Sequence, residues 1–333
     1  MIPISVLDLC PVIEGGDAGQ ALRNSRDLAR CAEAAGYKRF WLAEHHNIPS
    51  VASAATSVVI GYVADGTSTI RVGAGGVMLP NHAPLVIAEQ FGTLAELYPG
   101  RIDLGLGRAP GGDMASIRAL RRPMREGGED RFPHDVAELQ YFLGDPEEGK
   151  LQATPGAGTH VPIWILGSSL YGAQFAAHFG LPYAFASHFA PAELENAIRL
   201  YRDRYQPSED WPEPHLMLAA NIVAAKTDEE AAFLATTLYQ AFVNLRTGHS
   251  HKLVQPPAEG FLETLDPSAQ SMLRRTLRCS FIGGPEKIAR ELEVFIETHQ
   301  PDEMIFASQV FDHEKRKRSL EIAADCVSRL RAA

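Results

Sequence analysis

The amino-acid sequence predicts an α/β protein with the architecture of a (β/α)8 TIM barrel and long insertions after the fourth and seventh strands. Short apolar runs alternate with longer amphipathic segments, and eight of the short runs are strand candidates. The segments between them are long enough for the crossover helices that parallel strands require. No internal repeat or linker divides the chain, so residues 1–333 are predicted to form one domain. A doubly wound open sheet is the alternative, because a sequence does not show whether a sheet closes.

The first half of the chain supplies four strands and three helices, each delimited by turn residues. Helix 18–35 carries Leu22 and Leu28 on one face and stops at Gly36, and Pro99-Gly100 ends the third helix. In order, the elements are strand 2–7, helix 18–35, strand 39–42, helix 51–64, strand 69–72, helix 84–97 and strand 102–106.

The second half continues the alternation. Thr227 opens a helix with a capping box, since Glu230 lies three residues on, and Pro285 suits a first helical turn. In order, the elements are strand 161–166, helix 170–179, strand 183–186, helix 191–205, strand 216–223, the helix from Thr227, a short apolar segment 280–282, the helix from Pro285, strand 304–307 and helix 317–330.

The residues in excess of a simple barrel of ~250 residues fall in two segments, 110–159 and 245–278. Both are rich in glycine, proline or charged residues. Connections of that length in a compact domain are typically lids or functional insertions. The first contains a cluster of arginines (Arg118, Arg121, Arg122 and Arg125), which is either a solvated face or a second anion site.

Composition excludes several classes of partner. With 41 acidic and 31 basic side chains the net charge is −10, which disfavours binding to nucleic acid or to an anionic membrane. No signal peptide or run of ~20 apolar residues is visible. The four cysteines contain no CxxC pair, which disfavours a disulfide scaffold. The sequence therefore predicts a cytoplasmic protein that acts on a small molecule.

The basic run Lys315-Arg316-Lys317-Arg318 is interpreted as a solvated helix face.

Polar residues follow four successive predicted strands. Glu44-His45-His46 follows the second strand, Gly73-Ala74-Gly75-Gly76 the third, Arg108 the fourth and Ser168-Ser169 the fifth. In a barrel of this class the carboxyl ends of the strands share one rim, and the chemistry takes place there. The sequence therefore predicts a functional site at that rim.

The segment from Gly167 to Leu170 opens a helix, whose free N–H groups and dipole favour an anion. Arg108, at a neighbouring strand end, is placed to hold the same anion. The alternative is that Ser169 is only an N-cap and Arg108 a surface cation. Two other motifs fail on spacing: Pro110 stands where GxGxxG needs a glycine, and Tyr171 where GxSxG needs one.

No metal site is expected. His45 and His46 are adjacent, so their side chains point to opposite sides of an extended segment, and HExxH is absent. His45 facing the cavity as a hydrogen-bond donor or general base is one interpretation. A core histidine bonded to the backbone is the other.

Five motifs together resemble the bacterial luciferase-like flavin monooxygenases, most closely their single-chain, alkanal-monooxygenase-like branch. The likeness covers nearly the whole chain and is densest over residues 37–113. The motifs are Ala43-Glu44-His45-His46, the segment Gly73 to Pro80, His82-Ala83-Pro84-Leu85, Ala88-Glu89-Gln90, and the segment Pro99 to Arg108.

The resemblance implies a (β/α)8 barrel that binds FMN. His45 matches the family's active-site histidine and Glu44 a carboxylate beside the flavin. Gly75-Gly76 matches a pair joined by a cis peptide bond against the flavin ring. Arg108, Ser168 and Ser169 match phosphate-binding positions, and Gly172 stands where a family threonine reaches the phosphate, which leaves a backbone contact at most. Gly107 and Ser168 replace a cysteine and a glutamate of luciferase, which counts against light emission.

The activity implied is oxygenation of a small organic substrate by reduced FMN and dioxygen through a flavin hydroperoxide, with His45 as acid or base. A separate NAD(P)H-flavin reductase is the expected source of reduced FMN, and a homodimer is the expected assembly. Two alternatives remain: a deazaflavin-dependent hydride-transfer oxidoreductase, whose cofactor tail the Arg118–Arg125 cluster would bind, and a non-catalytic flavin-binding protein. A metal-dependent hydrolase is disfavoured by the histidine spacing.

Overall fold

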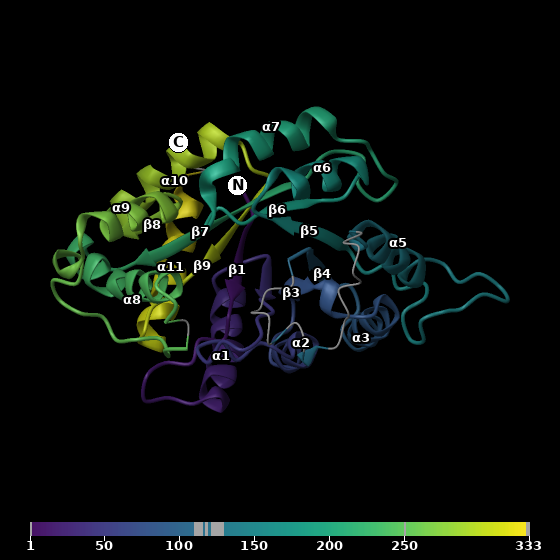
Figure 1. Ribbon diagram of the computed structural model, residues 1–333, viewed down its shortest axis with the longest axis horizontal. Coiled ribbons are helices and arrows are strands. Elements are labelled where there is room, and N and C mark those ends of the chain that lie inside the picture. The colour runs from purple at the N-terminus through teal and green to yellow at the C-terminus, as the bar shows by residue number, and fades with distance from the viewer. Residues whose placement is uncertain (1, 110–115, 117–118, 121–129, 250, 331–333) are drawn as a thin grey trace.

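The computed structural model describes residues 2–109, 116, 119–120, 130–249 and 251–330 (Figure 1). Among these residues, nine parallel strands belong to one sheet. They are β1 (Ile4–Asp8), β2 (Arg39–Leu42), β3 (Arg71–Met78), β4 (Ile102–Gly107), β5 (Ile163–Gly167), β6 (Tyr183–Phe185), β7 (Leu216–Ala224), β8 (Ser280–Gly283) and β9 (Glu303–Ala307).

Eight of the strands close into a barrel. Strands β1 to β7 pair in chain order, β7 also pairs with β9, and β9 pairs with β1. The (β/α)8 barrel is therefore confirmed, and the open-sheet alternative is wrong. The ninth strand, β8, pairs with residues 221–224 of β7, beyond the residues that pair with β6. It corresponds to the apolar segment 280–282, which lengthens the wall of the barrel beside β7.

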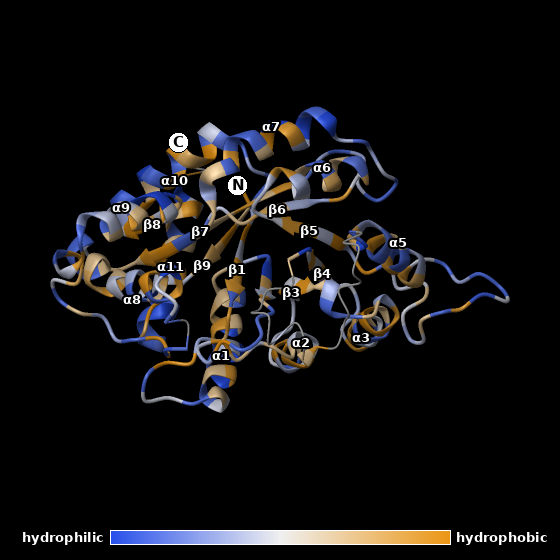
Figure 2. Cartoon of the chain, in the orientation of Figure 1, coloured by the Kyte–Doolittle hydropathy of each residue, from blue (hydrophilic) through white to orange (hydrophobic). Residues whose placement is uncertain are grey.

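Helices surround the barrel (Figure 1). Figure 2 shows the strands mainly in apolar colours, whereas the helices carry both apolar and polar residues. The described helices are α1 (Ala18–Ala34), α2 (Thr56–Asp65), α3 (Pro84–Leu97), α5 (Phe132–Leu143), α6 (Leu170–His178), α7 (Leu194–Arg204), α8 (Asp228–Arg246), α9 (Pro267–Thr276), α10 (Pro285–His299) and α11 (His313–Arg329), with the 3-10 turns η1 (Leu79–Asn81), η2 (Pro191–Glu193) and η3 (Leu262–Thr264).

Both predicted insertions contain a helix that the sequence analysis missed. Helix α5 lies within segment 110–159 and buries Phe132, Val136 and Leu139 on one face. Helix α9 lies within segment 245–278, where the carboxylate of Asp266 accepts hydrogen bonds from the first free N–H groups. Neighbouring glycines, prolines and charges obscured both amphipathic patterns. Helix α5 thus provides the crossover between β4 and β5.

Three element boundaries differ from the prediction by four residues or more. Strand β3 runs to Met78 rather than ending at residue 72, so Gly75 and Gly76 lie within it. Glycines disfavour isolated strands, but here β2 pairs with residues 71–74 on one side, and β4 pairs with residues 72–74 and 77–78 on the other. Helix α2 begins at Thr56 rather than 51, and α11 at His313 rather than 317.

The basic run at the start of α11 is not uniformly solvated, as the sequence analysis had it. Arg316 is buried, and its guanidinium donates to Asp8 Oδ1 at 2.7 Å and to the carbonyl of Ser308 at 2.7 Å. Lys315 and Arg318 keep exposed side chains. Arg316 therefore ties α11 to the ends of β1 and β9, because a buried guanidinium requires a carboxylate partner.

A charged network fills part of the barrel interior at the amino ends of the strands. Arg39 on β2 donates to Asp103 on β4 at 2.7 Å and to Glu303 on β9 at 3.0 Å. Asp103 Oδ2 also accepts from the Trp41 indole at 3.1 Å, and Asp103 Oδ1 from Arg71 at 2.6 Å. Asp103 and Glu303 are fully buried, so their charges depend on these partners.

None of the described helices combines the length and apolar character needed to cross a membrane.

Acid should destabilise the protein through Glu303. Burial raises the pKa of this carboxyl, but His215, Arg39, Lys38 and Ser5 together outweigh burial and lower the pKa to about 2. The folded pKa lies below the unfolded value of about 4.3. The contribution of Glu303 to the free energy of unfolding is therefore fully present above that value and is lost as the pH falls toward 2. Urea unfolding at a series of pH values should show this loss in the wild type and a shallower slope in Glu303→Gln between pH 5 and 2. Equal slopes would contradict the assignment.

Candidate functional site

The residues predicted at strand ends come together at one rim of the barrel. Strands β2 to β6 are consecutive neighbours, and their carboxyl ends lie in register: Leu42 opposite Ala74, Met78 opposite Gly107 and Gly167 opposite Phe185. Glu44 and His45 follow β2, Arg108 follows β4, and Ser168 and Ser169 follow β5. The structure therefore groups these residues on adjacent elements, as parallel strands of a closed barrel require.

Glu44 is buried, and both of its carboxylate oxygens have partners. Oε1 lies 2.7 Å from His46 Nε2 and 2.7 Å from His82 Nε2, and Oε2 accepts from the Met78 backbone N–H at 3.1 Å. Burial raises the pKa of Glu44, but the hydrogen bonds from His82, His46 and Met78 outweigh it and keep the pKa below its usual range. An ionised carboxylate only accepts, so both imidazoles donate through Nε2. Glu44 therefore links the loop after β2 to the end of β3.

The association of His46 with His82 was missed from the sequence, because 36 residues separate them and the link runs through Glu44. The sequence feature that came nearest to predicting it is that His46 and His82 each follow a strand, and that these strands, β2 and β3, are neighbours. The ligand atoms of Glu44, His46 and His82 lie within 4.8 Å of one another, so the group has the composition of a two-histidine, one-glutamate metal site. Direct hydrogen bonds account for the geometry without an ion.

Gly75 and Gly76 are joined by a cis peptide bond, as the resemblance implies. Neither position has room for a larger residue. A Cβ on Gly75 would lie 2.7 Å from Leu7 Cδ1, and one on Gly76 would lie 2.8 Å from the carbonyl oxygen of Gly105. Both glycines are half-buried, and a β-bulge interrupts the register with β4 between Ala74 and Val77. The segment therefore forms a side-chain-free shelf on the wall of the barrel.

Arg108 lies over the first turn of α6. Its guanidinium carbon is 4.0 Å from the centroid of the Tyr171 ring, and its Nε is 3.1 Å from Asp130 Oδ2. Burial and a hydrogen bond with Asp130 raise the pKa of Tyr171 to about 12, although the charge of Arg108 opposes the shift. Arg108 and the start of α6 are thus at the same place in the fold, not at opposite ends of it.

The amino end of α6 has spare hydrogen-bond donors. Ser169 is the N-cap, yet its hydroxyl makes no capping hydrogen bond to the helix. Ser168 is half-buried and Ser169 exposed. Unsatisfied N–H groups at a helix amino terminus, two hydroxyls and a guanidinium are the donor set that a phosphate group requires. The residues present therefore fit the phosphate of FMN.

Gly172 is buried in the first turn of α6, where it packs against β5 and β6. A Cβ there would lie 3.2 Å from Tyr183 Cε2 and 3.4 Å from Gly167 Cα. Close packing of the helix start against these strands explains the glycine without a ligand. Whether its backbone also contacts a phosphate stays a prediction.

His45, predicted as the catalytic residue, is half-buried in the loop after β2. The structure adds a second imidazole that the sequence analysis did not select: His188, in the segment after β6. Burial, together with a smaller effect of His45, lowers the pKa of His188 to about 4. No motif distinguished His188, because its burial depends on how the segment after β6 packs.

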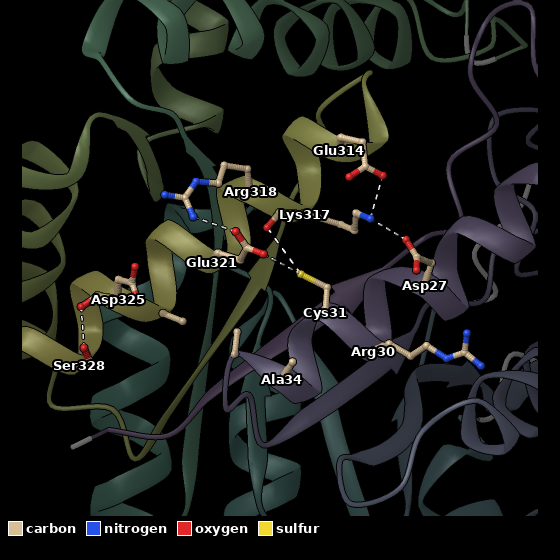
Figure 3. A pocket seen from close by; sticks show the side chains of 12 residues that line it. Asp27, Arg30, Cys31, Ala34, Glu314, Lys317, Arg318, Glu321, Asp325 and Ser328 are labelled. Carbon is tan, nitrogen blue, oxygen red and sulfur yellow. Dashed lines mark hydrogen bonds and ion pairs between the residues drawn. The ribbon is translucent and has the colours of Figure 1, made fainter.

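Two further features lie outside this rim or outside the described residues. A cavity of about 770 Å³ lies between α1 and α11, where Lys317 Nζ is 2.9 Å from Asp27 Oδ2 and 2.8 Å from Glu314 (Figure 3). Lys317 is paired with Asp27 and Glu314, Arg318 is paired with Glu321, and both helices belong to the outer layer. The arginines of the predicted cluster, Arg118 to Arg125, are not among the residues that the structure describes.

The family model for luciferase-like monooxygenases matches residues 3–299. A luciferase-like monooxygenase of Escherichia coli K12 is 50% identical over 325 residues, which cover 97% of this chain and 96% of the relative. An N-acetyl-S-alkylcysteine monooxygenase of Bacillus subtilis is 33% identical over 339 residues, covering 98% of each chain.

Solved structures agree with the fold. The crystal structure of apo-MsnO8 has a TM-score of 0.91 at 32% identity and covers 98% of this chain and 99% of its own. The oxygenating constituent of 3,6-diketocamphane monooxygenase, in complex with FMN, has a TM-score of 0.73 at 16% identity, with 99% and 98% covered. An F420-dependent secondary alcohol dehydrogenase has a TM-score of 0.72 at 15% identity, with 98% and 99% covered. The last two share the fold alone. Since the family model spans most of the chain and the relatives match it from end to end, this chain belongs to the luciferase-like monooxygenase family.

Proposed function

We propose that the protein is a flavin-dependent monooxygenase that uses reduced FMN and dioxygen to oxygenate a small organic substrate. When bound, the flavin supplies the activation of dioxygen, for which the flavin hydroperoxide is the expected route. The observation that carries the proposal is the position of the Arg108 guanidinium over the first turn of α6, beside the uncapped Ser169. It supports a phosphate site next to the Gly75-Gly76 shelf.

Each element of the rim then has a distinct task. Arg108, Ser168, Ser169 and the N–H groups of α6 bind the phosphate. The Gly75-Gly76 shelf lets the backbone approach the flat face of the ring, because glycine carries no side chain. His45 donates or accepts the proton that the oxygenation requires. Glu44 holds the loop that carries His45 against the end of β3.

Replacing Arg108 tests the phosphate assignment. Arg108→Ala should weaken FMN binding by about tenfold or more, the magnitude of a lost charge-assisted hydrogen bond. It should leave riboflavin binding unchanged, because riboflavin lacks the phosphate. Fluorescence titration with both flavins measures the difference. Arg131→Ala is the matched control, since Arg131 is an exposed arginine that pairs with Asp135. Equal losses for FMN and riboflavin would contradict the assignment.

The main rival is a deazaflavin-dependent oxidoreductase, because an F420-dependent enzyme shares the fold. Absorbance titration of the apoprotein with each cofactor separates the two proposals. A non-catalytic flavin-binding protein is the second rival, and it would consume no oxygen above the rate of free reduced flavin. Oxygenation should be assayed first with an N-acetyl-S-alkylcysteine, because the Bacillus relative is named for that class of substrate.

We also propose a homodimer and a separate flavin reductase as partners, in a cytoplasmic setting. Large apolar side chains are exposed on α2 and α3, with Val58 72% and Leu97 65% exposed. A second copy of the chain would cover them. Val58→Glu should therefore shift the protein from dimer to monomer in light scattering, whereas the exposed Val294→Glu on α10 should not. A monomeric wild type would refute the dimer.

A further inference from the structure

Among the described residues, two groups of three side chains bring potential metal-ligand atoms within 4.8 Å of one another. They are Glu44, His46 and His82 at the carboxyl rim of the barrel, and Asp27, His313 and Glu314 where α1 faces α11. A buried or half-buried carboxylate that already has a cationic partner gains little from a metal ion. The neighbours of each group therefore decide which of the two can take one.

The group between α1 and α11 already contains a cation. The Lys317 ammonium lies 2.9 Å from Asp27 Oδ2 and 2.8 Å from Glu314 Oε1, and Figure 3 shows it between these two carboxylates. His313 Nε2 lies 2.9 Å from the same oxygen of Asp27. A divalent ion would have to displace the ammonium, since two cations repel each other strongly at such distances. This group is therefore an ion-pair cluster that joins two outer helices.

The group at the rim has no such cation. Within the part of the chain that the structure describes, Glu44 has hydrogen bonds with two imidazoles and one backbone N–H, and no ion pair with a lysine or an arginine. These hydrogen bonds keep the pKa of Glu44 below its usual range, so its carboxylate is ionised. A metal ligand has to be deprotonated. Glu44 is thus an anionic ligand at a place where no side-chain ammonium or guanidinium competes.

The two imidazoles converge on one atom. His46 Nε2 and His82 Nε2 both lie 2.7 Å from Glu44 Oε1. In a tetrahedral zinc site, metal–ligand distances of about 2.0–2.1 Å separate the ligand atoms by about 3.3 Å, so each imidazole would have to withdraw by about 0.6 Å. Both histidines lie outside the helices and strands, and their side chains are 19% and 27% exposed. They therefore have room for a movement of this size.

The carboxylate itself can stay in place. Glu44 Oε2 accepts from the Met78 N–H at 3.1 Å, and the side chain is only 2% exposed. Hydrogen bonds of this kind orient the ligands of metal sites from the outer shell. Each neutral imidazole would carry its proton on Nδ1 instead of Nε2, so the Nε2 lone pair would face the ion without loss of a proton. The barrel needs no rearrangement for the three ligands to meet one ion.

The ligand atoms select the kind of ion. Imidazole nitrogens favour zinc and the neighbouring transition metals, whereas Mg²⁺ and Ca²⁺ prefer oxygen ligands. Three protein ligands leave one position of a tetrahedral site for another molecule. Because both imidazoles are partly exposed, water can reach the group and fill that position.

We propose that Glu44, His46 and His82 form a binding site for one divalent ion of the zinc class, with water as the fourth ligand. The ion would tie the loop after β2 to the segment after β3, where the hydrogen bonds of Glu44 join them. The sequence argument against a metal site concerned the adjacent pair His45-His46, whereas these ligands are brought together only by the fold. The site goes beyond the proposed function, and its test needs neither flavin nor turnover.

Titration with Zn²⁺ in competition with a chromophoric chelator provides that test. The protein should bind one equivalent of Zn²⁺, and an equal concentration of Mg²⁺ should not compete. His46→Gln and His82→Gln should each weaken Zn²⁺ binding by about 100-fold or more, because partners that only support a ligand already contribute about 10- to 100-fold. Glutamine keeps an N–H donor for Glu44, so each variant removes the imidazole ligand and retains a hydrogen bond.

The matched control is His313→Gln, in the group that contains Lys317, which should bind Zn²⁺ as the wild type does. Circular dichroism checks that each variant is folded. Co²⁺ in the site should show d–d absorption without a sulfur-to-metal charge-transfer band. Such a band would place the ion at one of the four cysteines and overturn the proposal. The proposal also fails if the wild type takes no Zn²⁺ from the chelator, if either rim variant binds as tightly as the wild type, or if His313→Gln loses the ion.

Discussion

His45→Ala should reduce productive oxygenation by about 100-fold or more, the usual contribution of a positioned acid or base. The affinity for FMN should change by less than about 1 kcal/mol, because the phosphate and the ring are held by other residues in the proposed site. Loss of a transition-state interaction without loss of cofactor binding is the signature of a catalytic group. Oxygen uptake together with product formation measures the first quantity, and fluorescence titration the second.

The matched control is His160→Ala, because His160 is an exposed imidazole that precedes β5 and pairs with Asp145 at 3.0 Å. It should leave both quantities unchanged. If His45→Ala kept the wild-type rate of oxygenation, His45 would have no acid–base role. If it lost FMN affinity in proportion to activity, its role would be in binding rather than in chemistry.

Asp103→Asn should lower the free energy of unfolding by about 3–5 kcal/mol, the cost of removing one member of a buried charged network. Asparagine keeps the shape of the side chain, but its amide nitrogen is a hydrogen-bond donor where the carboxylate oxygen was an acceptor. N–H donors of the neighbouring side chains would then face another donor. The Trp41 indole and the guanidiniums of Arg39 and Arg71 all donate to the carboxylate in the wild type. Arg39 would then retain Glu303 as its only carboxylate partner among these contacts.

Urea unfolding monitored by circular dichroism measures this difference. Asp145→Asn is the control, since Asp145 is 89% exposed and its pair with His160 is solvated. A loss of less than about 1 kcal/mol in Asp103→Asn, or a loss equal to that of the control, would show that the network does not stabilise the barrel.

The barrel itself was predictable because it repeats one local pattern. Each strand is short and apolar, each crossover is amphipathic, and eight repeats correspond to one closed architecture. Helices α5 and α9 were missed where glycine, proline and charge surround a short amphipathic stretch. The end of β3 was missed because the pairing of Val77 and Met78 with β4 outweighs the poor strand propensity of Gly73, Gly75 and Gly76.

The candidate site divides in the same way. Parallel strands of one barrel all end on the same side. The order of strands and turns in the sequence therefore predicts one shared rim for Arg108, Ser168 and Ser169. The order of the elements along the chain does not predict which side chains become partners across that rim. Glu44 pairs with His46 and His82, and Arg316 is buried against Asp8.

The sequence by itself determined the class of fold, the rim that carries polar residues, and the family to which the motifs point. These are properties of periodicity and of local motifs, which the chain encodes in consecutive residues. The tertiary structure alone decided which buried charges are neutralised by which, and which side chains meet across the rim. Those outcomes depend on the distances between loops that are remote in the chain, and only the closure of the barrel sets such distances.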